Sequence, residues 1–352
     1  MHMSWMVYGA NGYTGRLVAE LAVRRGERPL LAGRSAPKVA ELAGRLGLEH
    51  RVFDLVDPAG VRAALDGVEV VTHCAGPFSV TSAPMVDACL ATGTHYLDIT
   101  GEVDVFERVF ARHADAEQAG VVLLPGGGFD VVPTDCLAAM LAAALPGATE
   151  LDLAFLAGGG MSPGTLRTAM EGSAAGGRVR VNGELRTVPI GHRDRVAEFP
   201  SGPRRVTSIP WGDLATAYRS TRIPTITTFT SVPGPAGVVG KVQSFAAPLL
   251  RSSAVQQIGK DLLGLVRGPA EERRAASRSE VWGEVRDGAG RTATAALTAP
   301  NAYDLTADAV LRAVGRLRSG SVRPGAHTPS TAFGADFVRE LDGVQVRDPE
   351  VR

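Results

Sequence analysis

Residues 5–15 read Trp5-Met-Val-Tyr-Gly-Ala-Asn-Gly-Tyr-Thr-Gly15, and this stretch decides the fold. An apolar strand runs into regularly spaced glycines, a pattern typical of a tight strand-to-helix turn whose bare backbone lets a pyrophosphate reach the amides at the helix start. Residues 16–25 then show helical periodicity, and residues 28–33 form a second apolar strand. The stretch predicts the dinucleotide-binding turn of a Rossmann sheet, with a purely structural glycine turn as the alternative.

The turn after the second strand indicates which nicotinamide dinucleotide the chain takes. NAD sites usually place an acidic residue there to bind the ribose 2′-hydroxyl, whereas residues 28–37 contain no acid. The Arg34 guanidinium, with the Ser35 hydroxyl and Lys38 beside it, could instead bind a 2′-phosphate. We therefore predict NADP(H) as the cofactor. The alternative is a solvated arginine at a helix start.

Composition and charge exclude several classes of partner. The chain has 352 residues, 45% of them hydrophobic, and its 37 basic and 37 acidic residues balance, so no overall field attracts nucleic acid. The three cysteines form no C-x-x-C pair, which predicts no zinc or other metal site and fits a reducing cytoplasm. With no long apolar run and a strand close to Met1, we expect no membrane span, no signal peptide and a cytoplasmic location.

Residues 4–128 alternate between strands and helices, which predicts a doubly wound, mostly parallel sheet. Further strands are expected at 50–54, 68–73, 95–99 and 121–124. Helices are expected at 37–46, 58–66, 84–92 and 102–119. Ligands bind at the carboxyl ends of the strands in such sheets. The segments expected to meet there are Asp54, Cys74-Ala-Gly-Pro77, Asp98-Ile-Thr-Gly-Glu102 and Gly126-Gly-Gly-Phe-Asp130.

The pattern changes after Pro133, which predicts a second, α+β domain. Its expected parts are a helix at 135–145, a strand at 150–156, and hairpins formed by 178–181 with 184–188, 195–199 with 204–209, and 279–286 with 291–297. Asn182-Gly183 is the strongest hairpin signal in the chain. Helices are expected at 303–318 and 331–341. Segment 233–275 could be a mobile cover or a partner surface.

Several motifs in order resemble the saccharopine dehydrogenase-like oxidoreductases, in particular the bacterial branch described as trans-acting enoyl reductase-like. The resemblance extends over nearly the whole chain. The motifs are Gly9-Ala-Asn-Gly-Tyr-Thr-Gly15, Ala32-Gly-Arg-Ser35, Cys74-Ala-Gly-Pro-Phe78, Tyr96-Leu-Asp-Ile-Thr-Gly-Glu102, Gly128-Phe-Asp-Val-Val-Pro-Thr-Asp135, Pro210-Trp-Gly-Asp-Leu-Ala-Thr-Ala-Tyr218, Ser279-Glu-Val-Trp-Gly-Glu284 and Thr328-Pro-Ser-Thr-Ala-Phe-Gly334. The run of three glycines at 126–128 departs from the family pattern.

The resemblance implies an α/β protein: an N-terminal Rossmann domain at 1–130, an inserted α+β substrate and dimerisation domain at 131–320, and a segment at 321–352 that returns to the Rossmann domain. It implies a homodimer. It also implies cofactor-binding residues: Gly9, Asn11, Gly12, Tyr13, Thr14 and Gly15 at the pyrophosphate, Arg34 and Ser35 at the 2′-phosphate, Asp54 and Leu55 at the adenine, and Ala75, Gly76 and Pro77 along the ribose and nicotinamide. On the substrate side we place Phe78, Phe129, Thr165 and Tyr218.

Hydride transfer requires a proton source when the product carries new charge. No tyrosine is followed four residues later by lysine, which excludes the short-chain dehydrogenase mechanism. The catalytic candidates are Asp130, Asp98 and Glu102, and solvent is a further proton source. Asp98 could instead cap a helix and Glu102 could be first-turn helix charge. His73 is expected to be a core residue and Thr165 a helix cap, unless Thr165 offers amides to a substrate oxygen.

The sequence therefore predicts an NADPH-dependent reductase that transfers hydride to a C=C or C=N bond of a small or carrier-bound metabolite. The alternative is a catalytically silent NADP(H)-binding protein that reports redox state to a partner through segment 233–275. The residues do not identify the substrate, the hydride face or the proton donor.

Overall fold

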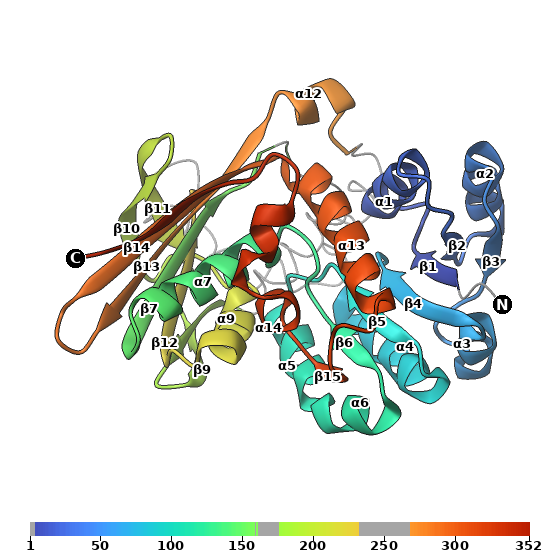
Figure 1. Ribbon diagram of the computed structural model, residues 1–352, viewed down its shortest axis with the longest axis horizontal. Helices are drawn as coiled ribbons and strands as arrows, with labels where there is room; N and C mark the ends of the chain where they lie inside the picture. The colour runs from blue at the N-terminus through green and yellow to red at the C-terminus, as the bar shows by residue number, and fades with distance from the viewer. Residues whose placement is uncertain (1–3, 159, 161–175, 232–267) are drawn as a thin grey trace. The chain divides into compact units, whose positions relative to one another are not determined.

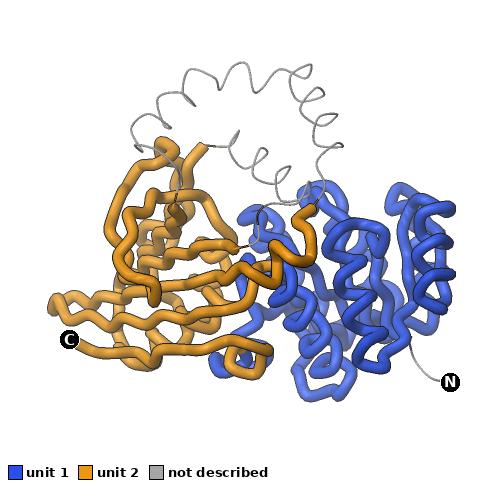
Figure 2. The backbone as a smooth tube through the Cα atoms, turned by 90° about the horizontal axis from the view of Figure 1, so that it is seen from above, with its two compact units in different colours: residues 1–132, 303–337 blue, residues 133–302, 338–352 orange. Residues whose placement is uncertain are grey.

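The computed structural model describes residues 4–158, 160, 176–231 and 268–352. Thr165 and most of segment 233–275, on which two predictions fall, lie outside the described residues. The chain forms two compact units, shown in blue and orange in Figure 2. Unit 1 comprises residues 1–132 and 303–337, and unit 2 comprises residues 133–302 and 338–352.

Unit 1 is built on a seven-stranded sheet in which every strand pair is parallel (Figure 1). The strand order is β15-β6-β5-β4-β1-β2-β3. Central strands such as β1 are buried and apolar, as expected where helices cover both faces of a sheet. The strands are β1 (Ser4–Tyr8), β2 (Leu30–Gly33), β3 (His50–Val52), β4 (Val68–His73), β5 (His95–Asp98), β6 (Val122–Leu124) and β15 (Gly325–Ala326).

The helices of unit 1 follow the predicted alternation with two corrections. The helix expected at 84–92 begins at Phe78, because the carboxylate of Glu102 accepts hydrogen bonds from its first amides, and Pro84 lies inside it. The helix expected at 102–119 breaks at Arg112. The helices are α1 (Tyr13–Arg24), α2 (Ala36–Leu46), α3 (Pro58–Leu65), α4 (Phe78–Thr92), α5 (Val103–Ala111), α6 (His113–Ala119), α13 (Ala302–Arg318), α14 (Pro329–Phe333) and the 3-10 helix η1 (Ala335–Glu340).

Unit 2 is built on a mixed nine-stranded sheet in which β7 and β12 are the parallel pair among the described strands. The three predicted hairpins are present, and Asn182 and Gly183 adopt the positive φ values that the first one needs. The predicted α/β fold with a second α+β domain is confirmed. The strands are β7 (Ala148–Leu156), β8 (Gly177–Val181), β9 (Glu184–Val188), β10 (Asp194–Phe199), β11 (Gly202–Ser208), β12 (Thr225–Thr230), β13 (Arg278–Asp287), β14 (Thr292–Pro300) and β16 (Gln345–Val351), and the helices are α7 (Val132–Ala144), α9 (Asp213–Thr221) and α12 (Glu271–Ala275).

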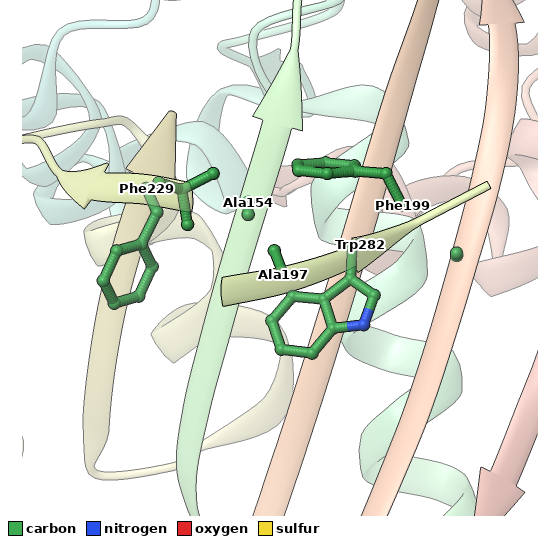
Figure 3. Close-up of a cluster of buried hydrophobic side chains, with 7 residues drawn as sticks. Ala154, Ala197, Phe199, Phe229 and Trp282 are labelled. Carbon is green, nitrogen blue, oxygen red and sulfur yellow. The ribbon is translucent and has the colours of Figure 1, made fainter. Parts of the chain in front are cut away.

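Side chains from six strands form the hydrophobic core of this sheet. Trp282, Phe229 and Phe199 pack with smaller residues between them (Figure 3). Burial of such large aromatic side chains contributes about 1.5–3 kcal/mol each. The smaller members of the cluster are Ala154, Ala197, Val206 and Ala296.

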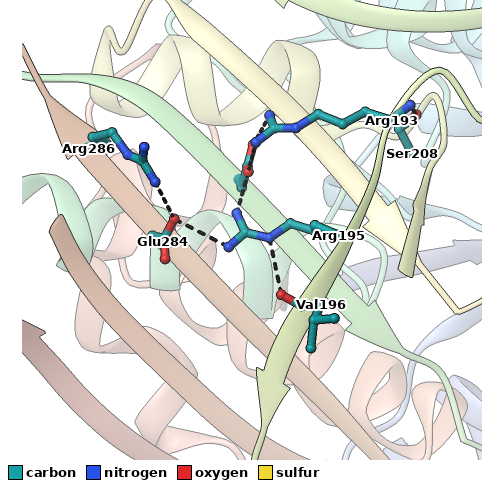
Figure 4. Close-up of polar contacts among 7 residues, drawn as sticks. Arg193, Arg195, Val196, Ser208, Glu284 and Arg286 are labelled. Carbon is teal, nitrogen blue, oxygen red and sulfur yellow. Dashed lines mark hydrogen bonds and ion pairs between the residues drawn. The ribbon is translucent and has the colours of Figure 1, made fainter. Parts of the chain in front are cut away.

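A network of ion pairs adjoins this hydrophobic core. Asp152 binds both Arg193 and Arg195, and Arg195 also contacts Glu284 at 3.3 Å (Figure 4). The guanidinium of Arg195 also lies 4.3 Å from the centre of the Trp282 ring. Burial raises the pKa of Asp152 although both arginines lower it. The loss of hydration therefore raises the pKa of Asp152 by more than the charges of its two arginine partners lower it.

The two units differ from the predicted domain boundaries at the C-terminal end. Helix α13, predicted to lie in the second domain, belongs to unit 1, where its Thr306 hydroxyl accepts a hydrogen bond from Phe129 N at 2.9 Å. Arg318 of α13 also binds Glu69 at 3.1 Å. Of the segment predicted to return to the Rossmann domain, residues 338–352 lie in unit 2, because β16 pairs with β14.

Candidate functional site

The strand order of unit 1 creates a switch point beside β1. The chain proceeds from β1 through β2 to β3 on one side and then continues at β4 on the other side. The turns that follow β1 and β4 therefore leave the sheet in opposite directions at its carboxyl edge. Doubly wound sheets bind their ligands in the crevice at this point.

The glycine turn after β1 has a shape that only glycine permits. Gly9 has a φ of +80°, and a Cβ atom placed on it would lie 2.8 Å from the Cβ of Ala75 in the turn after β4. A Cβ on Gly15 would lie 2.4 Å from the carbonyl oxygen of Gly9. Bare backbone thus lines the start of α1, as close approach of a pyrophosphate requires.

The start of α1 has the electrostatic character of an anion site. Its N-cap is Gly12, no side chain caps the helix, and its first turn contains no acidic residue. The positive end of the helix dipole is therefore not neutralised by the chain itself. Asn11, Tyr13 and Thr14, predicted to contact the pyrophosphate, lie in this turn and the first residues of α1.

The turn after β2 presents exposed positive charge next to the glycine turn. Arg34 and Lys38 are exposed and form neither an ion pair nor a hydrogen bond within the described part of the chain. Ser35 is the N-cap of α2, but its hydroxyl caps no amide, and the first turn of α2 has no acid. The two turns lie close together, because a Cβ on Gly33 would lie 3.1 Å from Asn11 Oδ1.

The predicted adenine side lies after β3. Asp54 is exposed and its Oδ1 accepts a hydrogen bond from Val56 N at 3.2 Å, whereas Leu55 is buried. Burial, with the Asp54 charge adding to it and the Arg34 charge opposing it, raises the pKa of Tyr8 to about 12. The opposite charges of Asp54 and Arg34 therefore both lie near the end of β1.

Glu102 precedes helix α5 but caps helix α4. Its two carboxylate oxygens accept hydrogen bonds from Phe78 N at 2.9 Å and Ser79 N at 2.7 Å, at the start of α4. The carboxylate thus caps a different helix from the one it precedes, and it holds the end of the turn formed by residues 74–77. The Gly76–Pro77 peptide bond in this turn is cis.

Asp98 joins three backbone segments at the end of β5. One of its oxygens accepts from Thr100 N at 2.9 Å and Gly126 N at 2.8 Å, and the other accepts from the Tyr96 hydroxyl at 2.6 Å. Burial raises the pKa of Asp98 to about 6 in spite of these donors, which favour the charged form. The residue therefore holds the loop that follows β6 onto β5.

Asp130 has a higher pKa than Asp98. Burial raises the pKa of this carboxyl to about 7. Its side chain lies over Gly101, where an added Cβ would come within 2.8 Å of Oδ2. A carboxyl with a pKa close to neutral pH can both hold and release a proton there, which suits proton transfer.

The three glycines before Asp130 let its loop pass between packed elements. A Cβ on Gly127 would lie 2.4 Å from Leu97 Cδ1, and one on Gly128 would lie 2.9 Å from Thr306 Cγ2. Gly127 N also donates to the carbonyl oxygen of Asp98 at 2.7 Å. The departure from the family pattern thus corresponds to close backbone packing against β5 and α13.

The predicted substrate residues that the structure describes belong to different units. Phe78 and Phe129 are buried in unit 1, and Phe129 N donates to Thr306. Tyr218 lies in unit 2 on α9, with its ring 4.3 Å from the guanidinium of Arg180. Packing accounts for these three side chains within their own units.

Sequence reasoning missed the role of Thr81, which lies on α4 beneath the turn at 74–77. Its hydroxyl lies 2.7 Å from the Ala75 carbonyl oxygen and 3.0 Å from Nε2 of His73. His73 is fully buried, as predicted for a core residue, and burial lowers its pKa to about 3. Burial likewise raises the pKa of Cys74 to about 12, so its thiol is not ionised at neutral pH.

Neither a metal centre nor a membrane-spanning helix occurs in the described part of the chain. No group of three or more His, Cys, Asp or Glu side chains is placed to hold a metal ion there. No described helix is both long enough and apolar enough to cross a membrane.

A parallel sheet with a glycine turn at its switch point and an arginine after its second strand defines a Rossmann-type dinucleotide-binding protein. Residues 5–124 match the family model of the saccharopine dehydrogenase NADP binding domain. This part of the chain is therefore similar to that domain family, and the similarity implies a nicotinamide dinucleotide as cofactor.

Curated relatives match part of the chain. A trans-acting enoyl reductase of Mycobacterium leprae is 35% identical over 139 residues, which cover 37% of this chain and 33% of that protein. A saccharopine dehydrogenase-like oxidoreductase of Mus musculus is 32% identical over 150 residues, covering 37% of this chain and 35% of that protein. The matches span less than half the length of these curated relatives.

Two solved structures share the fold over nearly the whole chain. Apo saccharopine dehydrogenase (L-Glu forming) of Saccharomyces cerevisiae matches with a TM-score of 0.62 at 13% identity, covering 99% of this chain and 100% of that one. The homospermidine synthase of Legionella pneumophila, in complex with NAD, matches with a TM-score of 0.63 at 10% identity, covering 99% and 92%. At these identities the likeness shows the fold alone.

Replacing Gly9 by alanine tests the close contact between the turns. Gly9→Ala meets both a positive φ and the Ala75 backbone, whereas Gly93→Ala meets a φ of +74° with no atom within 4 Å. We expect Gly93→Ala to cost about 1–2 kcal/mol of unfolding free energy and Gly9→Ala about 1–3 kcal/mol more, measured by urea denaturation. Equal losses in the two variants would contradict the steric argument.

Proposed function

We propose that the protein is an NADPH-dependent reductase of the saccharopine dehydrogenase-like kind, which transfers hydride to a C=C or C=N bond of a small or carrier-bound metabolite. The observation that carries the proposal is the exposed Arg34 and Lys38, with the half-buried Ser35 between them, beside the glycine turn. A guanidinium with no ion pair or hydrogen bond to any described residue, a hydroxyl that caps no amide and a helix start without acid suit a 2′-phosphate. NADP(H) is therefore favoured over NAD(H).

We assign different roles in the reaction to different residues of unit 1. A bound nicotinamide would supply the hydride. We assign Asp130 the transfer of the accompanying proton, because burial brings its pKa close to neutral pH. Asp98 and Glu102 are assigned to holding the surrounding loops, since their oxygens accept backbone and tyrosine hydrogen bonds.

The enoyl reductase named among the relatives supports a C=C bond as the first substrate class to test. A carrier-bound enoyl thioester fits that name, and an imine is the second class. We propose further that unit 2 carries the substrate side, with Thr165 and Tyr218, and the contact between two copies of the chain in a homodimer. A cytoplasmic location is proposed from the three free cysteines.

NADPH oxidation at 340 nm tests the activity directly. The purified chain is assayed with enoyl thioesters, imines and pairs of a 2-oxo acid with an amine. We expect turnover with one of these classes and none with the others. If NADPH binds tightly but none of the substrate classes is turned over, the result would instead favour a redox-reporting protein.

Arg34→Ala tests the choice of cofactor. We expect it to weaken NADPH binding by roughly tenfold to a hundredfold and NADH binding by less than about twofold, because a charge-assisted bidentate contact with the 2′-phosphate is lost. Arg24→Ala is the matched control, since Arg24 is an exposed arginine at the other end of α1. Fluorescence titration measures the ratio of NADPH to NADH affinity in each variant. An unchanged NADPH to NADH affinity ratio in Arg34→Ala would rule out this assignment.

Asp130→Asn tests the proton donor. Because the acid form is needed, we expect the wild-type rate to be constant well below pH 7 and to fall above it, and the variant to lose roughly a hundredfold or more in kcat together with this pH dependence. Asp66→Asn, at an exposed aspartate, is the control.

Stability provides a second measurement on Asp130 that needs no substrate. The folded pKa of about 7 lies above the ordinary value of 3.8 for an aspartate, so the folded state binds the proton more tightly than the unfolded chain does. The wild type should therefore lose stability relative to Asp130→Asn as the pH rises from about 4 to about 7. A pH-independent difference between the two proteins would contradict the raised pKa.

A further inference from the structure

The turn at residues 75–77 is held from beneath by one hydroxyl. Thr81, in the first part of α4, places its Oγ1 2.7 Å from the Ala75 carbonyl oxygen and 3.0 Å from the Pro77 carbonyl oxygen. The same atom lies 3.0 Å from His73 Nε2, at the end of β4. Thr81 thus connects the last residue of a strand, the turn that follows it and the helix that follows the turn.

Counting protons fixes the direction of each bond. A threonine hydroxyl has one proton to donate, and both carbonyl oxygens can only accept. The proton therefore goes to a carbonyl, and the shorter distance favours Ala75. Because the hydroxyl proton is used, His73 Nε2 must donate its own proton to Thr81 Oγ1. His73 is accordingly neutral, with its proton on Nε2 and none on Nδ1.

The surroundings of His73 agree with this assignment. Its Nδ1 is buried and has no hydrogen-bond partner among the described residues. The ring packs against aromatic neighbours, with centroids 5.3 Å from Phe78, 5.5 Å from Tyr8 and 6.2 Å from Tyr96. A proton on Nδ1 would have no acceptor there, so the Nε2–H tautomer is the form that this site accommodates.

Ala75 also forms the wall that Gly9 approaches. A Cβ on Gly9 would lie 2.9 Å from Ala75 N, so the turn after β4 is in contact with the glycine turn on one side and with Thr81 on the other. A shift of Ala75 would therefore move the surface between the proposed pyrophosphate site and the proposed nicotinamide site.

We propose that Thr81, held in place by His73, is a positioning residue that sets the orientation of the nicotinamide end of the cofactor through the Ala75 carbonyl. The proposal rests on the proposed function for the place of the nicotinamide along residues 75–77. The affinity for the rest of the cofactor comes from the two other turns, at residues 9–15 and 33–35. Loss of the Thr81 hydroxyl should consequently affect the geometry of reaction more than the binding of NADPH.

The variants are Thr81→Val, which removes the hydroxyl, and Thr81→Ser, which keeps it. Thr92→Val is the matched control, because Thr92 lies in the last turn of the same helix and donates to the Ala88 carbonyl oxygen at 2.9 Å. For Thr81→Val we expect kcat to fall by roughly tenfold to a hundredfold while the Kd for NADPH changes by less than about threefold. Thr81→Ser should recover most of kcat, and Thr92→Val should retain it.

Two measurements do not depend on turnover. The fluorescence lifetime of bound NADPH reports the freedom of the nicotinamide, and we expect Thr81→Val to shorten it while Thr81→Ser does not. Long-range ¹H–¹⁵N spectra of the protein without cofactor report the tautomer of His73, with His73→Gln used for assignment. We expect the Nε2–H form in the wild type and a changed Nε2 shift in Thr81→Val.

The outcomes separate the proposal from the proposed function. Failure of the wild type to bind NADPH would overturn both. NADPH binding with the same lifetime in Thr81→Val and wild type would overturn the positioning role and leave the proposed function standing. A His73 proton on Nδ1 would overturn the direction of the hydrogen bonds from which that role is inferred.

Discussion

The contact between Gly9 and Ala75 is the constraint on which the rest of unit 1 depends. The turns after β1 and β4 leave the sheet side by side and in opposite directions, and they meet with no room for a Cβ atom on Gly9. This approach brings the start of α1 and the start of α4 to the same edge of the sheet. Every candidate functional group of unit 1 is then placed by an element that follows one of the neighbouring strands.

Hydrogen bonds across the chain, rather than local sequence, hold the edge in shape. Glu102 caps α4 from the start of α5, and Asp98 holds the loop after β6 from the end of β5. The amides that Glu102 binds at the start of α4 and the Gly126 amide that Asp98 binds are at least 23 residues away in the chain. The acids of the crevice are thus part of the framework as well as candidates for chemistry.

The parts of the fold that sequence predicts are those fixed by local pattern. Apolar periodicity locates β1, and Asn182-Gly183 locates a hairpin because both residues tolerate positive φ. The start of α4 escapes prediction because its cap comes from Glu102. The two-residue strand β15 and the edge strand β16 escape it because each is defined by a partner distant in sequence. The glycine turn and Arg34 can be recognised as candidates because the patterns that mark them are local in the sequence. Thr81, in contrast, matters only through contacts that folding creates.

Two of the three candidate carboxyls, Glu102 and Asp98, hold backbone amides in place. Glu102 accepts two amide hydrogen bonds, and Asp98 accepts three from Tyr96, Thr100 and Gly126. Those donors lower the pKa of Asp98, which burial nevertheless raises to about 6. Burial also raises the pKa of Asp130, to about 7. Since an acid must release its proton readily at the pH of the reaction, donors that stabilise a carboxylate make it a better anchor and a poorer proton donor. Their hydrogen bonds give Asp98 and Glu102 a framework role, and the raised pKa of Asp130 is the ground on which we propose it as the proton donor.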